Sequence, residues 1–204
     1  MFSYLVILRR LFAVKSAQAL SCYFSTTRLE KKARWILIGE AKLEERSAQP
    51  YMGLRTQISM QEFGPAIPQL FGEVFAWLEK RGIAPAGAPF IRYHVINMAA
   101  KMDIEAGVPI ASILAGDERV KASILPGGRY ASLVFTGVEN GLAANKALLD
   151  WGAQHALRWD QWEAENGEAF GSRVEFSLTN PAEEPNPANW QTQIAIRLAD
   201  ERTH

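Results

Sequence analysis

The pattern of the stretch "FAWLEKRGI" (75–83) recurs in "LDWGAQHAL" (149–157), and this recurrence indicates how the chain folds. Trp77 and Trp151 occupy the same place in the two stretches, 74 residues apart. Each stretch ends a segment with apolar residues at helical spacing, and each segment precedes strand-like alternation. We therefore interpret the chain as an internal repeat of a strand–helix–strands unit.

The elements on either side of the two stretches support this repeat. The expected helices are 62–81, with Leu70, Phe71, Val74, Phe75 and Leu78 on one face, and 139–157. The expected strands are 54–60, 90–97, 101–107, 119–125, 129–137, 172–180 and 190–199. The turn "PGG" at 126–128 predicts that the strands on either side of it pair with each other. Residues 158–171 are expected to form a polar loop, with Trp159 and Trp162 either packed locally or acting as a lid.

Two such units predict an α+β fold, a curved antiparallel sheet with both helices on one side and a ligand cleft between the halves. The strand "SRVEFSLTN" (172–180) alternates apolar and polar residues. Counting along the repeat places Glu175 at the position of Tyr93, 82 residues earlier, and predicts that the two are neighbours across the cleft. The alternative for Glu175 is a solvated carboxylate on the open face of the sheet.

Composition excludes several classes of function. The 204 residues carry no net charge, although residues 1–46 are basic by five charges and the rest is acidic by five. One cysteine, Cys22, and three scattered histidines give no zinc-ligand spacing, so we expect no metal and no cofactor. Phosphate-binding and nucleophile-elbow motifs do not appear, and no apolar run is long enough to span a bilayer.

The N-terminal segment, residues 1–41, is expected to lie outside a folded domain that spans 42–204. It has no acidic residue before Glu30 and mixes Arg, Ser and apolar residues, which is typical of a mitochondrial presequence. The alternative is a wrongly assigned start with the true one near Ala41. We expect a cytoplasmic protein on the second interpretation and a mitochondrial one on the first.

Seven fragments, in order, resemble one family: "PYMGLRTQISM", "WLEKRGIAPAGAPFIRYH", "MDIEAGVPI", "LPGGRYASLVFTG", "LLDWG", "VEFSLTNPAEEP" and "WQTQIAIRLAD". Together they resemble the GyrI-like small-molecule-binding domain, which is also the effector-binding domain of AraC-type and MerR-type regulators. The resemblance covers residues 42–200. It implies transcription regulation or multidrug sensing, a duplicated fold, and a cleft for lipophilic, often cationic compounds.

Applied to this sequence, the resemblance implies a ligand-binding glutamate at Glu175 with aromatic walls at Tyr93, Tyr130, Phe135 and Trp190. Each aromatic residue has the alternative of ordinary packing in the sheet. Some free-standing members hydrolyse reactive cyclopropane-bearing toxins in the same cleft, which would make Glu175 catalytic. The family name also leaves open an inhibitory module that binds a protein partner.

Two further expectations concern partners and nearby carboxylates. Residues 1–46 do not fit a helix-turn-helix module, so we expect a small-molecule ligand and no direct contact with nucleic acid or membrane. The oligomeric state is left open. Asp103 and Glu105 share one face of a strand, and we expect them to hold the following turn through backbone N–H groups.

Overall fold

The computed structural model describes residues 37–200, so the predictions for the presequence-like segment lie outside it. The elements, in chain order, are β1 (Lys42–Arg46), β2 (Gln49–Ile58), α2 (Met60–Glu79), β3 (Phe90–Ile96), β4 (Met102–Pro109), β5 (Lys121–Leu125), β6 (Gly128–Thr136), η2 (Val138–Asn140), α3 (Gly141–Gln154), β7 (Gln161–Ala164), β8 (Gly167–Phe170), β9 (Arg173–Ser177), η3 (Pro187–Asn189) and β10 (Gln191–Arg197). The predicted helices and strands are all present, with ends shifted by a few residues.

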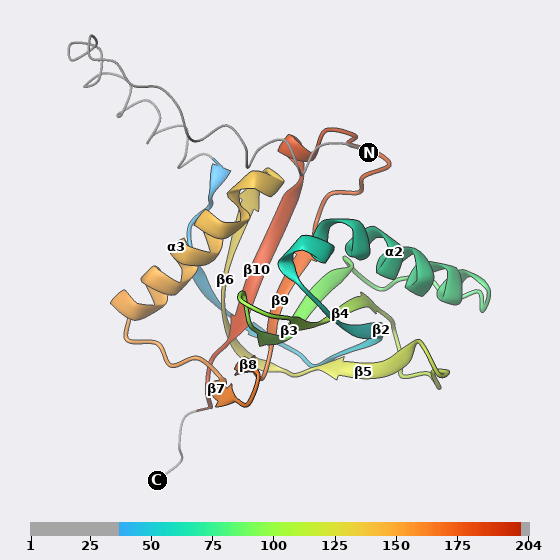
Figure 1. Cartoon of the computed structure of the whole chain (residues 1–204), viewed down its shortest axis with the longest axis horizontal. Helices are drawn as coiled ribbons and strands as arrows, with labels where there is room; N and C mark the ends of the chain where they lie inside the picture. The colour runs from blue at the N-terminus through green and yellow to red at the C-terminus, as the bar shows by residue number, and fades with distance from the viewer. Residues whose placement is uncertain (1–36, 201–204) are drawn as a thin grey trace. The chain divides into compact units, whose positions relative to one another are not determined.

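One antiparallel sheet holds all the strands in the order β1-β6-β10-β9-β3-β4-β2-β5, and the β7–β8 hairpin joins it at β3. Both long helices pack on the same face, α2 over β2 and β4 and α3 over β6 (Figure 1). The strands β9 and β3 pair with each other and join the two halves at the middle of the sheet. The predicted α+β fold, with two helices on one side of a curved antiparallel sheet, is confirmed.

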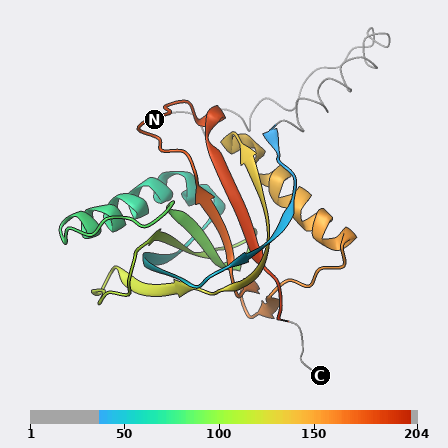
Figure 2. The same ribbon diagram turned by 180° about the vertical axis from the view of Figure 1, so that it is seen from behind.

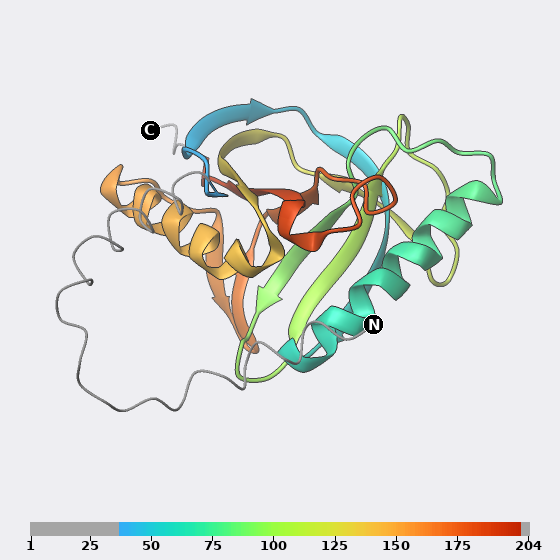
Figure 3. The same ribbon diagram turned by 90° about the horizontal axis from the view of Figure 1, so that it is seen from above.

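The sheet curls strongly on the side away from the helices. Tyr51 of β2 and Tyr130 of β6 belong to one buried cluster, although five strand spacings, about 24 Å in a flat sheet, separate their strands. The short connection from β1 to β2 links strands near opposite edges of the sheet. Figure 3 shows this β1–β2 ribbon arching over the side opposite the helices, and Figure 2 shows it crossing that side from behind.

Three apolar clusters follow from this arrangement. One lies under α2 and includes Leu54, Val74 and Ile104, while a second lies under α3 and includes Leu133 and Leu148. The third, the inner cluster, fills the inside of the curl and includes Phe90 and Val174. The seam between the two halves, along β3 and β9, therefore has a helix-side cluster on each flank.

The buried face of α2 differs from the predicted face at two positions, Phe75 and Trp77. Leu70, Val74 and Leu78 are buried as predicted, but Phe75 is 38% exposed and Trp77 takes its place in the core. The α2 face is rotated toward Trp77 because the sheet lies under positions 70, 74, 77 and 78.

The turn at 126–128 does not pair the strands on either side of it, so that prediction is wrong. β5 pairs with β2, while β6 pairs with β1 and β10. A Pro-Gly-Gly sequence favours a tight turn, but the curl of the sheet decides which strand edges meet. The region predicted as a loop, 158–171, contains the β7–β8 hairpin, and Trp159 packs with the α3 cluster. β1 was not predicted as a strand.

The inner cluster makes Gly107 a sensitive position. A Cβ on Gly107 would lie 2.4 Å from Phe90 Cζ and 2.9 Å from Tyr51 Cδ2. Both rings are fully buried and pack edge to face, so neither has room to move aside. We expect Gly107→Ala to lower the free energy of unfolding by about 1–3 kcal/mol, as overpacking does, measured by urea denaturation.

The control for this change is Gly72→Ala, on the exposed side of α2. A Cβ there would meet nothing within 4 Å, and alanine is the better helix former. The control is expected to raise stability by about 0.5–1 kcal/mol. Equal midpoints for wild type and Gly107→Ala would show that the inner cluster accommodates an added methyl group.

Candidate functional site

Glu175 lies on the helix side of the sheet, at the seam between the halves. Its neighbours along β9, Val174 and Phe176, belong to the inner cluster on the other face. Strand alternation therefore directs Glu175 to the helix side, where it is opposite Ile91 of β3 and Ile194 of β10. The side on which the carboxylate lies was the question that the sequence left open.

Both oxygens of the Glu175 carboxylate accept hydrogen bonds. The Tyr93 hydroxyl donates to Oε2 at 3.1 Å, and the Asn145 side-chain amide donates to Oε1 at 2.9 Å. Tyr93 is on β3 in the first half, whereas Asn145 is on α3 in the second. The predicted contact between Tyr93 and Glu175 is confirmed, and α3 supplies a donor that the sequence did not indicate.

A second set of contacts holds these partners. Arg173 donates to Asn145 Oδ1 at 2.8 Å, and its guanidinium lies 4.9 Å from the centre of the Phe170 ring. Burial lowers the pKa of Arg173, while the charge of Glu175 opposes that shift. On the other side, the Phe63 ring of α2 is stacked parallel to the Tyr93 ring at 6.3 Å. Both helices thus contribute to the surroundings of Glu175, α3 through Asn145 itself and α2 through Phe63, which packs on Tyr93.

Tyr93 is fixed as a neutral donor. Burial, together with the neighbouring Glu175 carboxylate, raises the pKa of Tyr93 well above its ordinary value. At neutral pH its hydroxyl therefore keeps its proton and stabilises the carboxylate by donating to it. The pair combines an anionic group with an aromatic face, an arrangement that can hold a cation or, with water, act as an acid–base pair.

The other aromatic residues implied by the resemblance lie at different places. Phe135 is buried on the helix side, in the cluster under α3, with its ring against Gly141. Trp190 is half-buried at the start of β10, and its indole N–H donates to Glu184 O at 2.6 Å. Tyr130 belongs to the inner cluster on the opposite face from Glu175, and its hydroxyl donates to Pro126 O.

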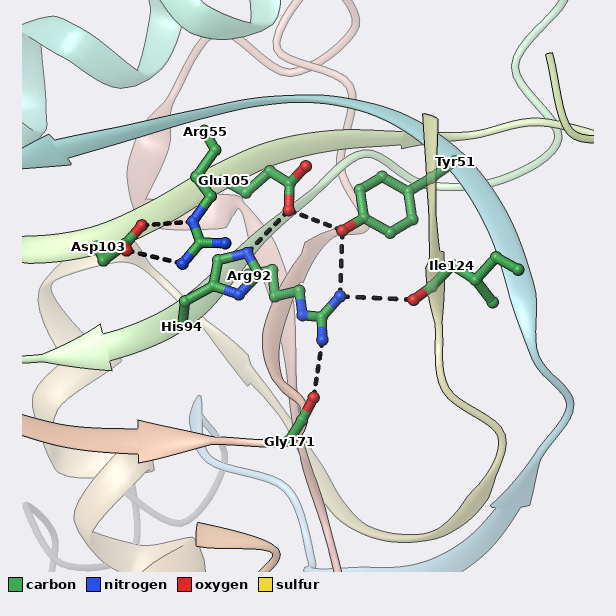
Figure 4. A network of polar contacts seen from close by, with 8 residues as sticks. All are labelled: Tyr51, Arg55, Arg92, His94, Asp103, Glu105, Ile124 and Gly171. Carbon is green, nitrogen blue, oxygen red and sulfur yellow. Dashed lines mark hydrogen bonds and ion pairs between the residues drawn. The ribbon is translucent and has the colours of Figure 1, made fainter. Parts of the chain in front are cut away.

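A second polar cluster lies inside the curl, and the sequence did not predict it (Figure 4). Glu105 is only 5% exposed and accepts hydrogen bonds from Tyr51 at 2.7 Å and from His94 Nε2 at 2.8 Å. Arg92 donates to the Tyr51 hydroxyl at 3.1 Å and to Gly171 O at 2.8 Å. One signal for this cluster was present in the sequence. His94 follows Tyr93 in the same strand, so its imidazole lies on the face opposite the Glu175 site.

The charge state of Glu105 follows from its neighbours. Burial acts to raise its pKa, but the hydrogen bonds from His94 and Tyr51 and the charge of Arg92 together hold the pKa below its usual range. An ionised carboxylate only accepts hydrogen bonds, so the His94 Nε2 atom carries a proton.

Asp103 and Glu105 have different roles from the one expected for them. Asp103 pairs with Arg55 through two bonds of 2.8 Å, and Glu105 bonds to the side chains described above. The expectation that both hold the turn through backbone N–H groups is therefore wrong. The two carboxylates instead bond to side chains of the neighbouring strands β2 and β3.

Two further findings concern the described part of the chain. Residues 37–200 contain no group of three or more His, Cys, Asp or Glu side chains placed to hold a metal ion. Within the same residues, no helix has the length and apolar character needed to cross a membrane.

Comparisons with known proteins agree with this architecture. A family model described as the GyrI-like small molecule binding domain matches residues 40–199. The fold is similar to EcmrR in a complex with DNA (TM-score 0.63, 18% identity, 89% of this chain and 65% of that chain). It is also similar to the EcmrR C-terminal domain (TM-score 0.61, 17% identity, 79% of this chain and 98% of that one).

A third similar structure is SAV2435 bound to tetraphenylphosphonium (TM-score 0.55, 12% identity, 79% of this chain and 94% of that chain). The chain spans 65% of the length of the EcmrR chain in the DNA complex, but nearly all of the isolated C-terminal domain. No curated protein sequence matches the chain.

Proposed function

The chain belongs to the GyrI-like small molecule binding domain family, and from that premise we propose that it binds a lipophilic cation beside Glu175. The observation that carries the proposal is the position of the carboxylate, which lies at the seam of the two halves and is held by two uncharged donors. Hydrogen bonds from Tyr93 and Asn145 orient the carboxylate without neutralising its charge.

The surroundings of Glu175 suit a cation with an apolar body. The carboxylate is half-buried, and a charge that is partly removed from water attracts an opposite charge more strongly. The stacked rings of Phe63 and Tyr93 supply aromatic surface next to it. Phe135 and Trp190, on or near the α3 side, would provide the opposite wall.

A relative supports the same ligand class. SAV2435, which shares the fold, is bound to tetraphenylphosphonium, a cation with four aromatic rings. For this chain we propose a compound of that kind, recognised by charge at Glu175 and by ring contacts at the flanking aromatic side chains. In this proposal the chain senses or sequesters the ligand without converting it.

We expect Glu175→Gln to weaken the binding of tetraphenylphosphonium by about 1–3 kcal/mol, roughly 5- to 150-fold in Kd. The substitution preserves the shape of the side chain and removes its charge. Binding is measured by isothermal titration calorimetry on the full chain, with the neutral compound triphenylphosphine oxide as a second ligand. The neutral compound should bind wild type and variant alike.

The matched control is Glu163→Gln, which removes an exposed carboxylate from β7. It should leave the Kd within twofold of wild type. If Glu175→Gln and Glu163→Gln behave alike, Glu175 does not contact the ligand and the proposal is wrong. If the wild type releases more than one equivalent of product from a cyclopropane-bearing electrophile, and Glu175→Gln does not, the chain is a hydrolase.

A further inference from the structure

A pocket opens on the other face of the sheet, at one end of the curl. Its volume is about 320 Å³, and Arg46, Pro109, Leu125, Tyr130, Val174 and Phe176 are among the residues that line it. It lies where β2 and β6 begin and where β4, β5 and β9 end. Val174 and Phe176 flank Glu175 in β9 and therefore direct their side chains away from the Glu175 site.

The wall of this pocket combines aromatic surface with a single cation. The Arg46 guanidinium lies 4.7 Å from the centre of the Phe176 ring and 5.4 Å from that of Tyr130. Of the described residues that line the pocket, Arg46 alone carries a charged side chain. The other lining residues named above are apolar, apart from the Tyr130 hydroxyl, which is bonded to Pro126 O.

Arg46 is held in place by an ion pair with Glu44 of its own strand. Its Nε donates to Glu44 Oε1 at 2.8 Å, and Nη2 donates to the same oxygen. Among the residues that the structure describes, Nη1 has no hydrogen-bond partner, so this edge of the guanidinium is available to an acceptor. A planar guanidinium that stacks on rings and keeps one free edge is suited to a carboxylate attached to an aromatic body.

We propose that this pocket is a second small-molecule site, which binds an aromatic carboxylate of one or two rings. The carboxylate accepts from Arg46 Nη1, and the ring lies among Tyr130, Phe176 and Leu125. The volume is at the lower end of the range for ligand pockets, which limits the ligand to that size. The site has the opposite charge preference from the Glu175 site.

The test uses 2-naphthoate as the probe, titrated into the full chain in a calorimeter. Wild type should bind it with a Kd at or below about 1 mM, and should bind the neutral 2-naphthylmethanol about tenfold more weakly. Arg46→Gln should remove this difference between the two compounds. Ala88→Leu, which fills the pocket from a lining loop residue, should weaken both by at least about tenfold.

Two controls separate this site from the proposed cation site. Ala86→Leu changes an exposed residue of the same loop, outside the pocket lining, and should bind 2-naphthoate as wild type does. Glu175→Gln should also leave 2-naphthoate binding unchanged. The proposal is overturned if wild type shows no binding at 2 mM, if Ala88→Leu binds normally, or if Glu175→Gln weakens 2-naphthoate as much as Ala88→Leu does. If Arg46→Gln does not fold, the comparison of Ala88→Leu with Ala86→Leu decides the question alone.

Discussion

Replacing Glu105 with alanine is expected to lower the free energy of unfolding by about 3–5 kcal/mol. Glu105 is the acceptor at the centre of the cluster inside the curl, where it receives the Tyr51 hydroxyl and His94 Nε2 (Figure 4). Without the carboxylate, these two donors and the nearby Arg92 guanidinium remain buried with fewer partners. Leaving buried polar groups unpaired costs more than the hydrogen bonds themselves contribute.

Two matched variants separate this effect from the loss of any carboxylate. Glu105→Gln keeps the shape of the side chain and one acceptor oxygen, so its free energy of unfolding should fall less than that of the alanine variant. Asp103→Ala breaks the ion pair with Arg55, whose side chain is 54% exposed, and should cost about 1 kcal/mol or less. Urea denaturation at pH 7 gives all three values. Similar losses for Glu105→Ala and Asp103→Ala would show that the polar contacts of Glu105 contribute no more stability than a surface ion pair.

The second large effect is an alkaline loss of stability that depends on Tyr51. Burial, with the neighbouring charge of Glu105, raises the pKa of Tyr51 to about 12. In the unfolded chain the same hydroxyl titrates near its ordinary value of about 10. The folded state therefore holds the proton more tightly, and this contribution to stability is complete below about pH 10 and declines as the pH rises toward 12.

The expected size is about 3 kcal/mol for a difference of about two pKa units. The free energy of unfolding of wild type should fall steeply between pH 10 and 12, and Tyr51→Phe should fall less steeply, although it starts from a lower value at pH 7. Tyr93→Phe should also flatten the fall, because the pKa of Tyr93 is raised well above its ordinary value. Parallel curves for wild type and Tyr51→Phe would contradict the raised pKa of Tyr51.

The candidate site could be predicted only in part, and the division follows from geometry. Strand alternation and the repeat were sufficient to bring Tyr93 to Glu175, since both are properties of a regular backbone. Asn145 and Phe63 were missed because they reach the seam from helices, whose rotation over the sheet depends on packing. Tyr130 shares the aromatic character of a cleft residue, but its place in β6 directs it to the inner face.

The sequence by itself determined the duplicated strand–helix–strands order and the helix side as the place of two core clusters, because apolar periodicity and turn residues act locally. Only long-range packing sets the curl of the sheet. The curl determines which strand edges pair, that the strands on either side of residues 126–128 do not pair with each other, and that Glu105, His94 and Tyr51 meet. These contacts join β2, β3 and β4 across the concave face. No local pattern specifies these contacts, because alternation within a strand assigns each side chain to one face of the sheet but does not select the neighbouring strand.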